Sequence, residues 1–463
     1  MDYFKKTKIA HILKENDKAR DSVIVMGWIR TRRDSSNLAF LEINDGSSLA
    51  NLQIVLENPE NFADLERAKL GASVHLEGPL VPVPERKHKI EMHPISLTVV
   101  GDCPPEYPLQ KKRHSFEYLR EIAHLRPRTN TFGVISRFRS KISYAVHKFF
   151  QDRGFYYVHS PVITGTDAEG AGDMFRVTTL DLYKLPFVDK NIDFDKDFFA
   201  SESFLTVTGQ LEAELMATAL GDVYTFAPTF RAENSNTSRH LSEFWMVEPE
   251  MAFCDLFENM QLAGEFLKYL FRYALDECAE EMSFFNQWIN KDRIKTLESV
   301  INTDFIQCPY TDAVEILKKA KKKFVFPVDW GVDLQSEHER FLCEEHFKAP
   351  VMVYDYPRQI KAFYMRVNDD GKTVGALDVL VPQIGEIIGG SQREERLDLL
   401  KDQVEYFNID EKTVDWYYDI RRYGTVPHAG FGLGFARVLM YMSGMSNIRD
   451  VIPFPRAPRS AKF

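Results

Sequence analysis

The run "TFRAENSNTSRHLSEFWMVEPEMAF" joins two strand-like segments through a polar loop and holds several side chains suited to binding anions. Arg231 and Glu233 lie two residues apart on the first segment, so on a strand they would share a face. The loop adds Arg239 and His240, and Phe244 opens the returning segment with a flat apolar ring. Arginine forks beside an aromatic ring can hold a nucleoside triphosphate. A charged hairpin face that serves only solubility is the alternative interpretation.

A glycine-rich run, "GFGLGFARVLMY", is a second candidate anion site. Gly430, Gly432 and Gly434 precede a segment with helical spacing that carries Arg437. The glycines resemble a dinucleotide-binding fingerprint, but no second strand ending in an acidic residue follows about 20 residues on, as that fingerprint requires. The run therefore predicts a strand of closely packed glycines and then a helix whose first turn presents Arg437 to a phosphate.

Two acidic residues, Asp378 and Glu386, lie on the segment "LDVLVPQIGEIIGGSQREE" close to Gly389. Hard oxygen ligands beside a phosphate site suit Mg²⁺, and glycine next to an acid lets a ligand approach closely. Acidic residues that only decorate the surface are the alternative. Arg393 follows on the same segment.

Acidic side chains also occur where a substrate amine could be bound. The loop "TGTDAEGAGDMF" is rich in glycine and acids and has no lysine, which fits an ammonium group better than a phosphate. Gln210, Glu212 and Glu214 open a predicted helix, where acids can also merely complement the helix dipole. Arginines for a polyphosphate, an acid for Mg²⁺ and acids for an amine together suit the activation of an amino acid by ATP. The substrate carboxylate can itself attack the α-phosphate, so the protein supplies position and charge.

Composition describes an ordinary globular protein of 463 residues, with 44% hydrophobic and 27% charged residues and a net charge of −10. No apolar run approaches the roughly 18 residues that span a bilayer, and the charged start lacks the apolar core of a secretory signal. The five cysteines are scattered without close pairs, which supports neither a disulfide framework nor a zinc site and favours a cytoplasmic location. Any nucleic acid would be bound by local patches such as "RTRRD" rather than by the net charge.

Two structural regions are expected to carry these residues. Residues 1–105 read as short strands with one helical piece, which favours a five-stranded all-β barrel of the OB type. A stretch rich in proline and charge, 106–130, is the predicted linker. Residues 131–463 mix strand hairpins with helices and predict an α+β domain on an antiparallel sheet. Its first helix spaces Ile135, Phe138, Ile142, Ala145 and Phe149 along one face. Further helices are expected at about 255–281, 311–321, 394–407 and 411–422 and from Phe435 onward.

With these motifs in view, the chain resembles the class II aminoacyl-tRNA synthetases of the aspartate/asparagine/lysine subgroup over nearly its whole length. The long helix with the strand ending at Pro161 matches motif 1, "TFRAE…RHLSEFWMVEPEM" matches motif 2, and "GFGLGFARVL" matches motif 3. The three motifs stand in family order behind an OB domain. The resemblance implies a homodimer assembled through motif 1.

The resemblance also implies roles in binding ATP. Arg231 would hold the α-phosphate and the substrate carboxylate, and Glu233 would contact the adenine amino group or the ribose side. Arg239 and His240 would hold the β- and γ-phosphates, and Phe244 would stack on adenine.

The remaining ATP and metal contacts would come from the C-terminal motifs. Arg437, with Gly434 at the start of its helix, would cover the other adenine face and reach the γ-phosphate. Glu386 would bind Mg²⁺. Gly389 stands where relatives often have a serine ligand, so Asp378 or Ser391 would have to compensate.

For the amino acid, Glu169 and Gln210 match positions that hold the substrate's α-amino group and backbone, and Arg393 matches the arginine that reads the side-chain oxygen. Aspartate enzymes have a lysine where this chain has Ala213, and losing that cation disfavours an acidic substrate. Glu214 would then accept a hydrogen bond from an amide NH₂ and repel a carboxylate. Together with long segments similar to bacterial asparaginyl enzymes, this favours L-asparagine and tRNA(Asn) as substrates.

The N-terminal domain would read the anticodon. Phe40 on the second strand matches a phenylalanine that stacks on the central base, and Gln53 on the third strand matches a glutamine that hydrogen-bonds it. Arg30 and Arg33 would contact phosphates or flanking bases.

Three other functions stay open at this stage. An aspartate–tRNA ligase, either specific or charging both tRNAs, is disfavoured by Ala213. An ammonia-dependent asparagine synthetase on the same fold would not need Phe40 and Gln53. A nucleic-acid-binding protein without enzymatic activity would not need Arg231 and Arg437.

Overall fold

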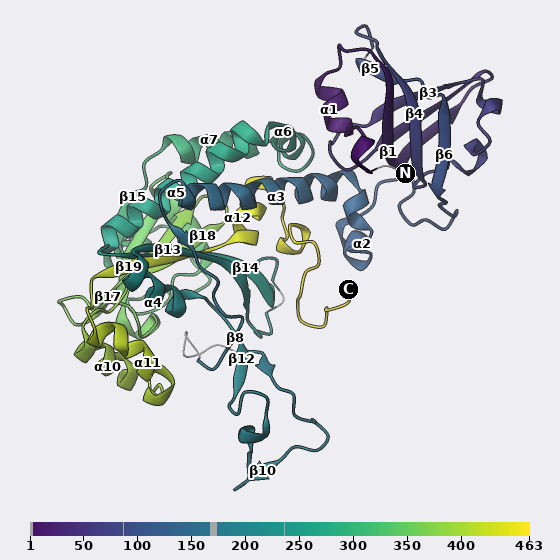
Figure 1. Ribbon diagram of the computed structural model, residues 1–463. Helices are drawn as coiled ribbons and strands as arrows, with labels where there is room; N and C mark the ends of the chain where they lie inside the picture. Colours follow the sequence, from purple (N-terminus) through teal and green to yellow (C-terminus); the bar gives the residue numbers. More distant parts are fainter. Residues whose placement is uncertain (1–2, 87, 167–173, 236) are drawn as a thin grey trace. The chain divides into compact units, whose positions relative to one another are not determined.

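The computed structural model describes residues 3–86, 88–166, 174–235 and 237–463 (Figure 1). The chain forms two compact units, residues 1–134 and 135–463. Among the described residues, no helix combines the length and the apolar character needed to cross a bilayer.

The first unit contains a closed sheet in the order β1-β2-β3-β5-β4-β6, and an additional pairing of β1 with β4 closes it into a barrel. Its strands are β1 (Arg20–Asp34), β2 (Leu38–Asn44), β3 (Leu52–Glu57), β4 (Ser73–Pro82), β5 (Ile90–Met92) and β6 (Ser96–Gly101). Alternate residues of β2 fill the core, since Ala39, Leu41 and Ile43 are buried. The predicted OB-type barrel is therefore confirmed.

Two local expectations in this unit were wrong. The stretch "HKIEMHPISLTVVG", expected to form the last of five strands, is divided into β5 and β6 around Pro94. The Pro94 backbone passes so close to Gly78 that a β-carbon on this glycine would lie 2.5 Å from the Pro94 Cα. The expected helical piece consists of two 3₁₀ turns, η2 (Pro59–Asn61) and η3 (Leu65–Arg67). Two short helices complete the unit, α1 (Ile9–Lys14) and α2 (Phe116–Glu121), and α2 lies within the predicted linker.

The second unit is built on an eight-stranded sheet in the order β15-β16-β17-β18-β19-β14-β13-β7. Only the outer pairs β15–β16 and β7–β13 are parallel, so the centre of the sheet is antiparallel, as predicted. Its strands are β7 (Tyr156–Tyr157), β13 (Asp222–Phe230), β14 (Glu243–Ala252), β15 (Ile306–Pro309), β16 (Val351–Pro357), β17 (Thr373–Val381), β18 (Gly385–Gln392) and β19 (His428–Gly434).

Helices flank this sheet (Figure 1). The long helix α3 (Asn130–Gln151) buries the five apolar residues predicted for its inner face, and a left-handed Gly154 follows its end. A capping box of Asp255 and Glu258 starts α5 (Leu256–Glu277), which packs against β17, β18 and β19. The other helices are α4 (Gln210–Leu220), α6 (Ala279–Trp288), α7 (Arg293–Asn302), α8 (Tyr310–Lys319), α9 (Ser336–Arg340), α10 (Leu397–Tyr406), α11 (Glu411–Arg422) and α12 (Phe435–Ser443).

An arm with two small sheets lies between α3 and α4 in the sequence and projects from this unit (Figure 1). Its strands are β8 (Ile163–Thr164), β9 (Arg176–Val177), β10 (Phe187–Val188), β11 (Asn191–Ile192) and β12 (Ser203–Leu205). Within the arm, the Asp197 carboxylate accepts hydrogen bonds from Thr178 Oγ1 at 2.6 Å and from Thr179 N at 2.9 Å and so joins two segments of the chain.

Candidate active site

The hairpin singled out in the sequence is formed by β13 and β14, with Thr229 opposite Phe244. The shared-face argument for Arg231 and Glu233 was wrong, because β13 ends at Phe230 and both residues lie in the loop. The structure nevertheless brings Arg231 and Phe244 together, with the guanidinium carbon 5.6 Å from the ring centroid. Glu233 is exposed.

The loop between these strands is fastened to the segment that precedes β18. Arg239 donates to the carbonyl of Ile384 at 2.7 Å and to Ser336 Oγ at 3.3 Å. Burial and the nearby Arg437 lower the pKa values of both Arg239 and His240. Several cationic groups therefore crowd one region, which an anionic ligand would relieve.

Arg437 reaches the same region from the first turn of α12. Its Nη1 donates to the carbonyl oxygen of Glu386 at 3.2 Å and lies 3.4 Å from the Glu386 carboxylate. The preceding strand β19 packs as predicted, since a β-carbon on Gly430 would lie 2.3 Å from the Pro249 carbonyl and one on Gly432 2.5 Å from Met246. Gly434 has more room, because its nearest neighbour would be 3.7 Å away.

Two carboxylates flank the position of Gly389, and a third lies beside one of them. A β-carbon there would lie 3.1 Å from Glu386 Oε1 and 3.6 Å from Asp378 Oδ1, so the two predicted metal ligands flank one glycine. Asp378 is paired with Lys361 at 2.9 Å. Glu339, which the sequence analysis missed, accepts from the Glu386 N–H at 3.1 Å, and burial, reinforced by the charge of Glu386, raises its pKa to about 8.

Carboxylates gathered in this way can serve as ligands for a cation. No group of three or more His, Cys, Asp or Glu side chains forms a metal cage within the described parts of the chain. Mg²⁺, however, is commonly held by one or two carboxylates together with substrate phosphates and water. The hard oxygens of Glu386 and Asp378 beside Arg437 fit that pattern.

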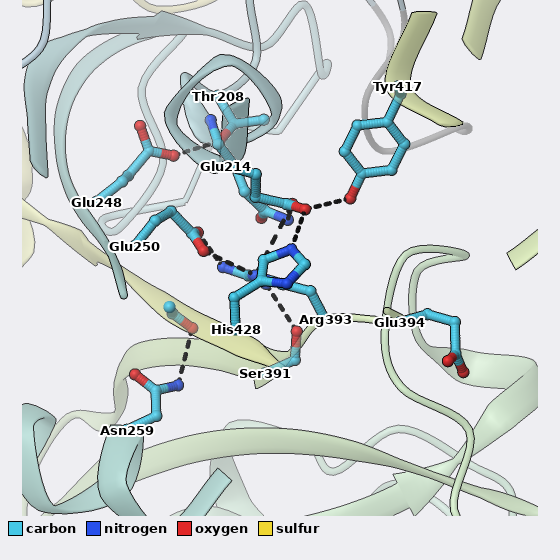
Figure 2. A network of polar contacts seen from close by, with 12 residues as sticks. Thr208, Glu214, Glu248, Glu250, Asn259, Ser391, Arg393, Glu394, Tyr417 and His428 are labelled. Carbon is cyan, nitrogen blue, oxygen red and sulfur yellow. Dashed lines mark hydrogen bonds and ion pairs between the residues drawn. The ribbon is translucent and has the colours of Figure 1, made fainter. Parts of the chain in front are cut away.

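A buried polar network contains Glu214, and Figure 2 shows Tyr417 and His428 directed at its carboxylate. Glu214 Oε2 accepts from Tyr417 Oη at 2.5 Å and Arg421 Nη2 at 3.0 Å and lies 2.9 Å from His428 Nε2. Its Oε1 accepts from Gln210 Nε2 at 3.0 Å. The side chains of Glu214 and Arg421 are both fully buried.

Arg393 adjoins this network because its guanidinium pairs with the carboxylates of Glu214 and Glu250. Its Nε lies 3.9 Å from Glu214 Oε1, and its guanidinium grips Glu250 with both Nε and Nη2. Nη1 donates to Ser391 Oγ at 2.7 Å. Burial raises the pKa of Glu250 although Arg393 opposes this, and the two side chains are almost completely enclosed. The structure thus gathers Gln210, Glu214 and Arg393, three residues predicted to bind the amino acid.

Glu248, the other acid of the returning strand, has a different task. Its carboxylate accepts from the Thr208 hydroxyl, from Gly209 N at 3.0 Å and from Thr225 Oγ1 at 3.0 Å. Gly209 caps α4, so Glu248 fastens the start of the helix that carries Gln210 and Glu214. Glu169, also predicted for the amino acid, lies outside the described residues.

In the first unit, the predicted anticodon residues are only partly brought together. Arg33 stands opposite Phe40 on neighbouring strands, with its guanidinium carbon 5.1 Å from the ring centroid. Gln53 lies on the adjacent strand and donates to the Leu41 carbonyl at 3.2 Å. Arg30 is instead engaged by the Arg128 carbonyl and by Asn130 Oδ1 at 2.8 Å.

Comparison with known proteins now identifies the family. Residues 116–458 match the model of "tRNA synthetases class II (D, K and N)", and residues 23–100 match that of the "OB-fold nucleic acid binding domain". An asparagine–tRNA ligase of Synechocystis sp. is 56% identical over 463 residues, covering 99% of this chain and 100% of the relative. An asparagine–tRNA ligase of Clostridium tetani is also 56% identical, with 99% and 100% covered.

Solved structures agree. The asparaginyl-tRNA synthetase of Pyrococcus horikoshii complexed with asparaginyl-adenylate superposes with a TM-score of 0.86 at 30% identity, covering 99% of both chains. The asparaginyl-tRNA synthetase of Entamoeba histolytica, at 24% identity and a TM-score of 0.80 over 96% of this chain and 97% of that one, shares the fold. The resemblance found in the motifs is confirmed: the chain belongs to the class II tRNA synthetases of the D, K and N group and, within it, to the asparagine–tRNA ligase family.

Proposed function

We propose that this protein attaches L-asparagine to tRNA(Asn) in two steps that consume ATP. In the first step the asparagine carboxylate attacks the α-phosphate, which forms asparaginyl-adenylate and releases diphosphate. In the second step a ribose hydroxyl at the tRNA 3′ end attacks the activated carbonyl, and AMP leaves. The family assignment supports this reaction, as does the adenylate bound in a solved relative.

The cationic region around the hairpin loop supports the proposed ATP site. Arg231 and Phe244 lie together, as a residue pair for the α-phosphate and adenine requires. Arg239, His240 and Arg437 would surround the β- and γ-phosphates. Because positioned cations stabilise the charge that develops on a transferring phosphoryl group, this arrangement needs no protein nucleophile.

Mg²⁺ would be held by Glu386 and Asp378, the two carboxylates that flank Gly389. When bound, the ion would neutralise charge on the triphosphate. Glu339, which binds the Glu386 backbone, would hold that strand in place.

The proposal that the substrate is asparagine rather than aspartate rests on one observation, the proximity of Glu214 and Arg393. An amide side chain has an oxygen that accepts and an NH₂ group that donates. Arg393 has five N–H groups, of which three are engaged by Glu250 and Ser391 among the described residues, so two remain for a ligand oxygen. Glu214, beside it, would accept from the amide and repel a carboxylate.

Other surfaces support the proposed macromolecular partners. Phe40, Arg33 and Gln53 offer a ring, a cation and an amide on neighbouring strands, which suits a splayed anticodon base. Tyr144 of α3 and Tyr156 of β7 are 61% and 58% exposed on the predicted dimer elements, and β7 is a sheet edge. All five cysteines are free, which supports a reducing compartment such as the cytoplasm.

The test measures ATP–diphosphate exchange with asparagine and with aspartate, followed by charging of purified tRNA. We expect exchange to be far faster with asparagine. Phe40→Ala should reduce tRNA charging strongly while leaving exchange nearly unchanged, because the barrel takes no part in adenylate formation. Faster exchange with aspartate, or ammonia-dependent formation of free asparagine, would overturn the proposal.

A further inference from the structure

The two oxygens of the Glu214 carboxylate have unequal surroundings. Oε2 contacts Tyr417, Arg421 and His428, all of which approach from α11 or from the start of β19. Oε1 faces Gln210 at 3.0 Å and Arg393 at 3.9 Å, the two residues predicted to hold the amino acid. Oε2 is thus held by residues of α11 and β19, whereas Oε1 is directed toward the residues predicted to bind the amino acid.

Among the residues that contact Glu214 Oε2, Arg421 carries a positive charge that does not depend on pH. Its Nε donates to the Glu394 carbonyl at 2.9 Å, and its Nη2 donates to both Glu214 Oε2 and Tyr417 Oη. Tyr417 in turn stays a donor, because burial raises its pKa well above the usual value although Arg421 opposes this. The arginine is therefore clamped in one orientation with its charge against Glu214.

His428 strengthens the same arrangement. Its Nδ1 lies 2.8 Å from the Val426 carbonyl and its Nε2 lies 2.9 Å from Glu214 Oε2. Nε2 also lies 3.4 Å from Arg421 Nη2, so the ring contacts both the carboxylate and the guanidinium.

A carboxylate in this environment depends on its cations. Burial by itself would raise the pKa of Glu214, yet Arg421, followed by His428 and Arg393, holds it well below the usual range. Without such partners a fully buried carboxyl takes up a proton instead of keeping its charge. A protonated Glu214 could donate a hydrogen bond, and a carboxylate ligand could then accept it.

We infer that Arg421 is a positioning residue for amino-acid selection: it keeps Glu214 charged and oriented so that Oε1 accepts from an amide NH₂ and repels a carboxylate. The inference rests on the proposed function, which assigns asparagine to this site. Arg421 is buried behind Glu214 and acts through it. Its removal should therefore change which amino acid is chosen, beyond any effect on overall activity.

The experiment compares kcat/KM for asparagine and aspartate in ATP–diphosphate exchange for a set of variants. Arg421→Met should lower the asparagine-to-aspartate ratio by roughly 10-fold or more, chiefly through a higher KM for asparagine. Arg421→Lys keeps the charge and should retain most of the preference. Arg422→Met is the matched control, because this neighbour on α11 pairs at the surface with Asp415 at 2.9 Å and Asp419 at 2.8 Å. It should leave the ratio unchanged.

Two further variants separate selection from folding. Tyr417→Phe removes a single donor to Glu214 and should shift the ratio in the same direction by a smaller factor. Glu214→Gln removes the charge directly, so adding Arg421→Met to it should not lower the ratio further, since both act through one group. If Arg421→Met and Tyr417→Phe reduced both substrates equally, or if the double variant were additive, the inference would be overturned. A wild-type preference for aspartate would instead overturn the proposed function itself.

Discussion

Glu248 of β14 offers a stringent test of how the hairpin supports the proposed amino-acid site, through the substitution Glu248→Gln. Glu248 is 3% exposed, and its carboxylate accepts from Thr208, Gly209 and Thr225. Glutamine has the same shape but replaces one acceptor oxygen with an NH₂ donor. At least one of the three donors then loses its acceptor, and the oxygen that remains is uncharged.

The expected cost follows from these contacts. Hydrogen bonds to charged groups contribute about 1.5–3 kcal/mol each, so Glu248→Gln should destabilise the start of α4 by about 2 kcal/mol. Glu248→Ala, which leaves all three donors without their acceptor, should cost about 4 kcal/mol. Because α4 carries Gln210 and Glu214, KM for asparagine should rise while KM for ATP changes little.

Hydrogen exchange of the α4 amides is the suitable assay, because it reports local stability in a protein of two units. A loss of about 2 kcal/mol corresponds to roughly 30-fold faster exchange. Glu243→Gln, at the start of the same strand, is the control and should leave α4 unchanged. Wild-type exchange rates in Glu248→Gln would refute the anchoring role.

Three further predictions concern other parts of the structure. Gly430→Ala places a β-carbon 2.3 Å from the Pro249 carbonyl. This overlap should lower the free energy of unfolding by about 3 kcal/mol and so lower the melting temperature in a thermal scan. An unchanged melting temperature would contradict the close packing. Iodoacetamide at mildly alkaline pH should alkylate Cys103 and spare the four buried cysteines. Burial raises the pKa of the Cys254 thiol, for example, to about 12. Peptide mapping by mass spectrometry measures the labelling, and equal labelling of all five cysteines would disprove the prediction. Asp378→Asn should raise the Mg²⁺ concentration that gives half-maximal ATP–diphosphate exchange by about 10-fold, because it removes one of the two carboxylate charges that flank Gly389. An unchanged Mg²⁺ titration would exclude Asp378 from the proposed cation site.

The sequence alone was sufficient for features that depend on local pattern. Helical spacing predicted the buried face of α3, and alternation with turn residues predicted the barrel strands, because periods of 3.6 and 2 residues are visible within a short window. The motif residues Arg231, Phe244 and Arg437 were also found locally. The exact ends of elements were less reliable: β13 ends before Arg231, and one expected barrel strand is split at Pro94.

Only the tertiary structure decided what the buried charges do. Nothing near Glu214 in the sequence indicates Arg421 and His428, which lie 207 and 214 residues away, and nothing near Glu250 indicates Arg393. A buried charge is tolerated only when partners surround it, and long-range folding alone supplies those partners. The motifs therefore revealed the residues predicted to bind ATP, whereas the packing of α4, α11, β14 and β19 determined how Glu214, the carboxylate proposed to contact the amino acid, is held and charged.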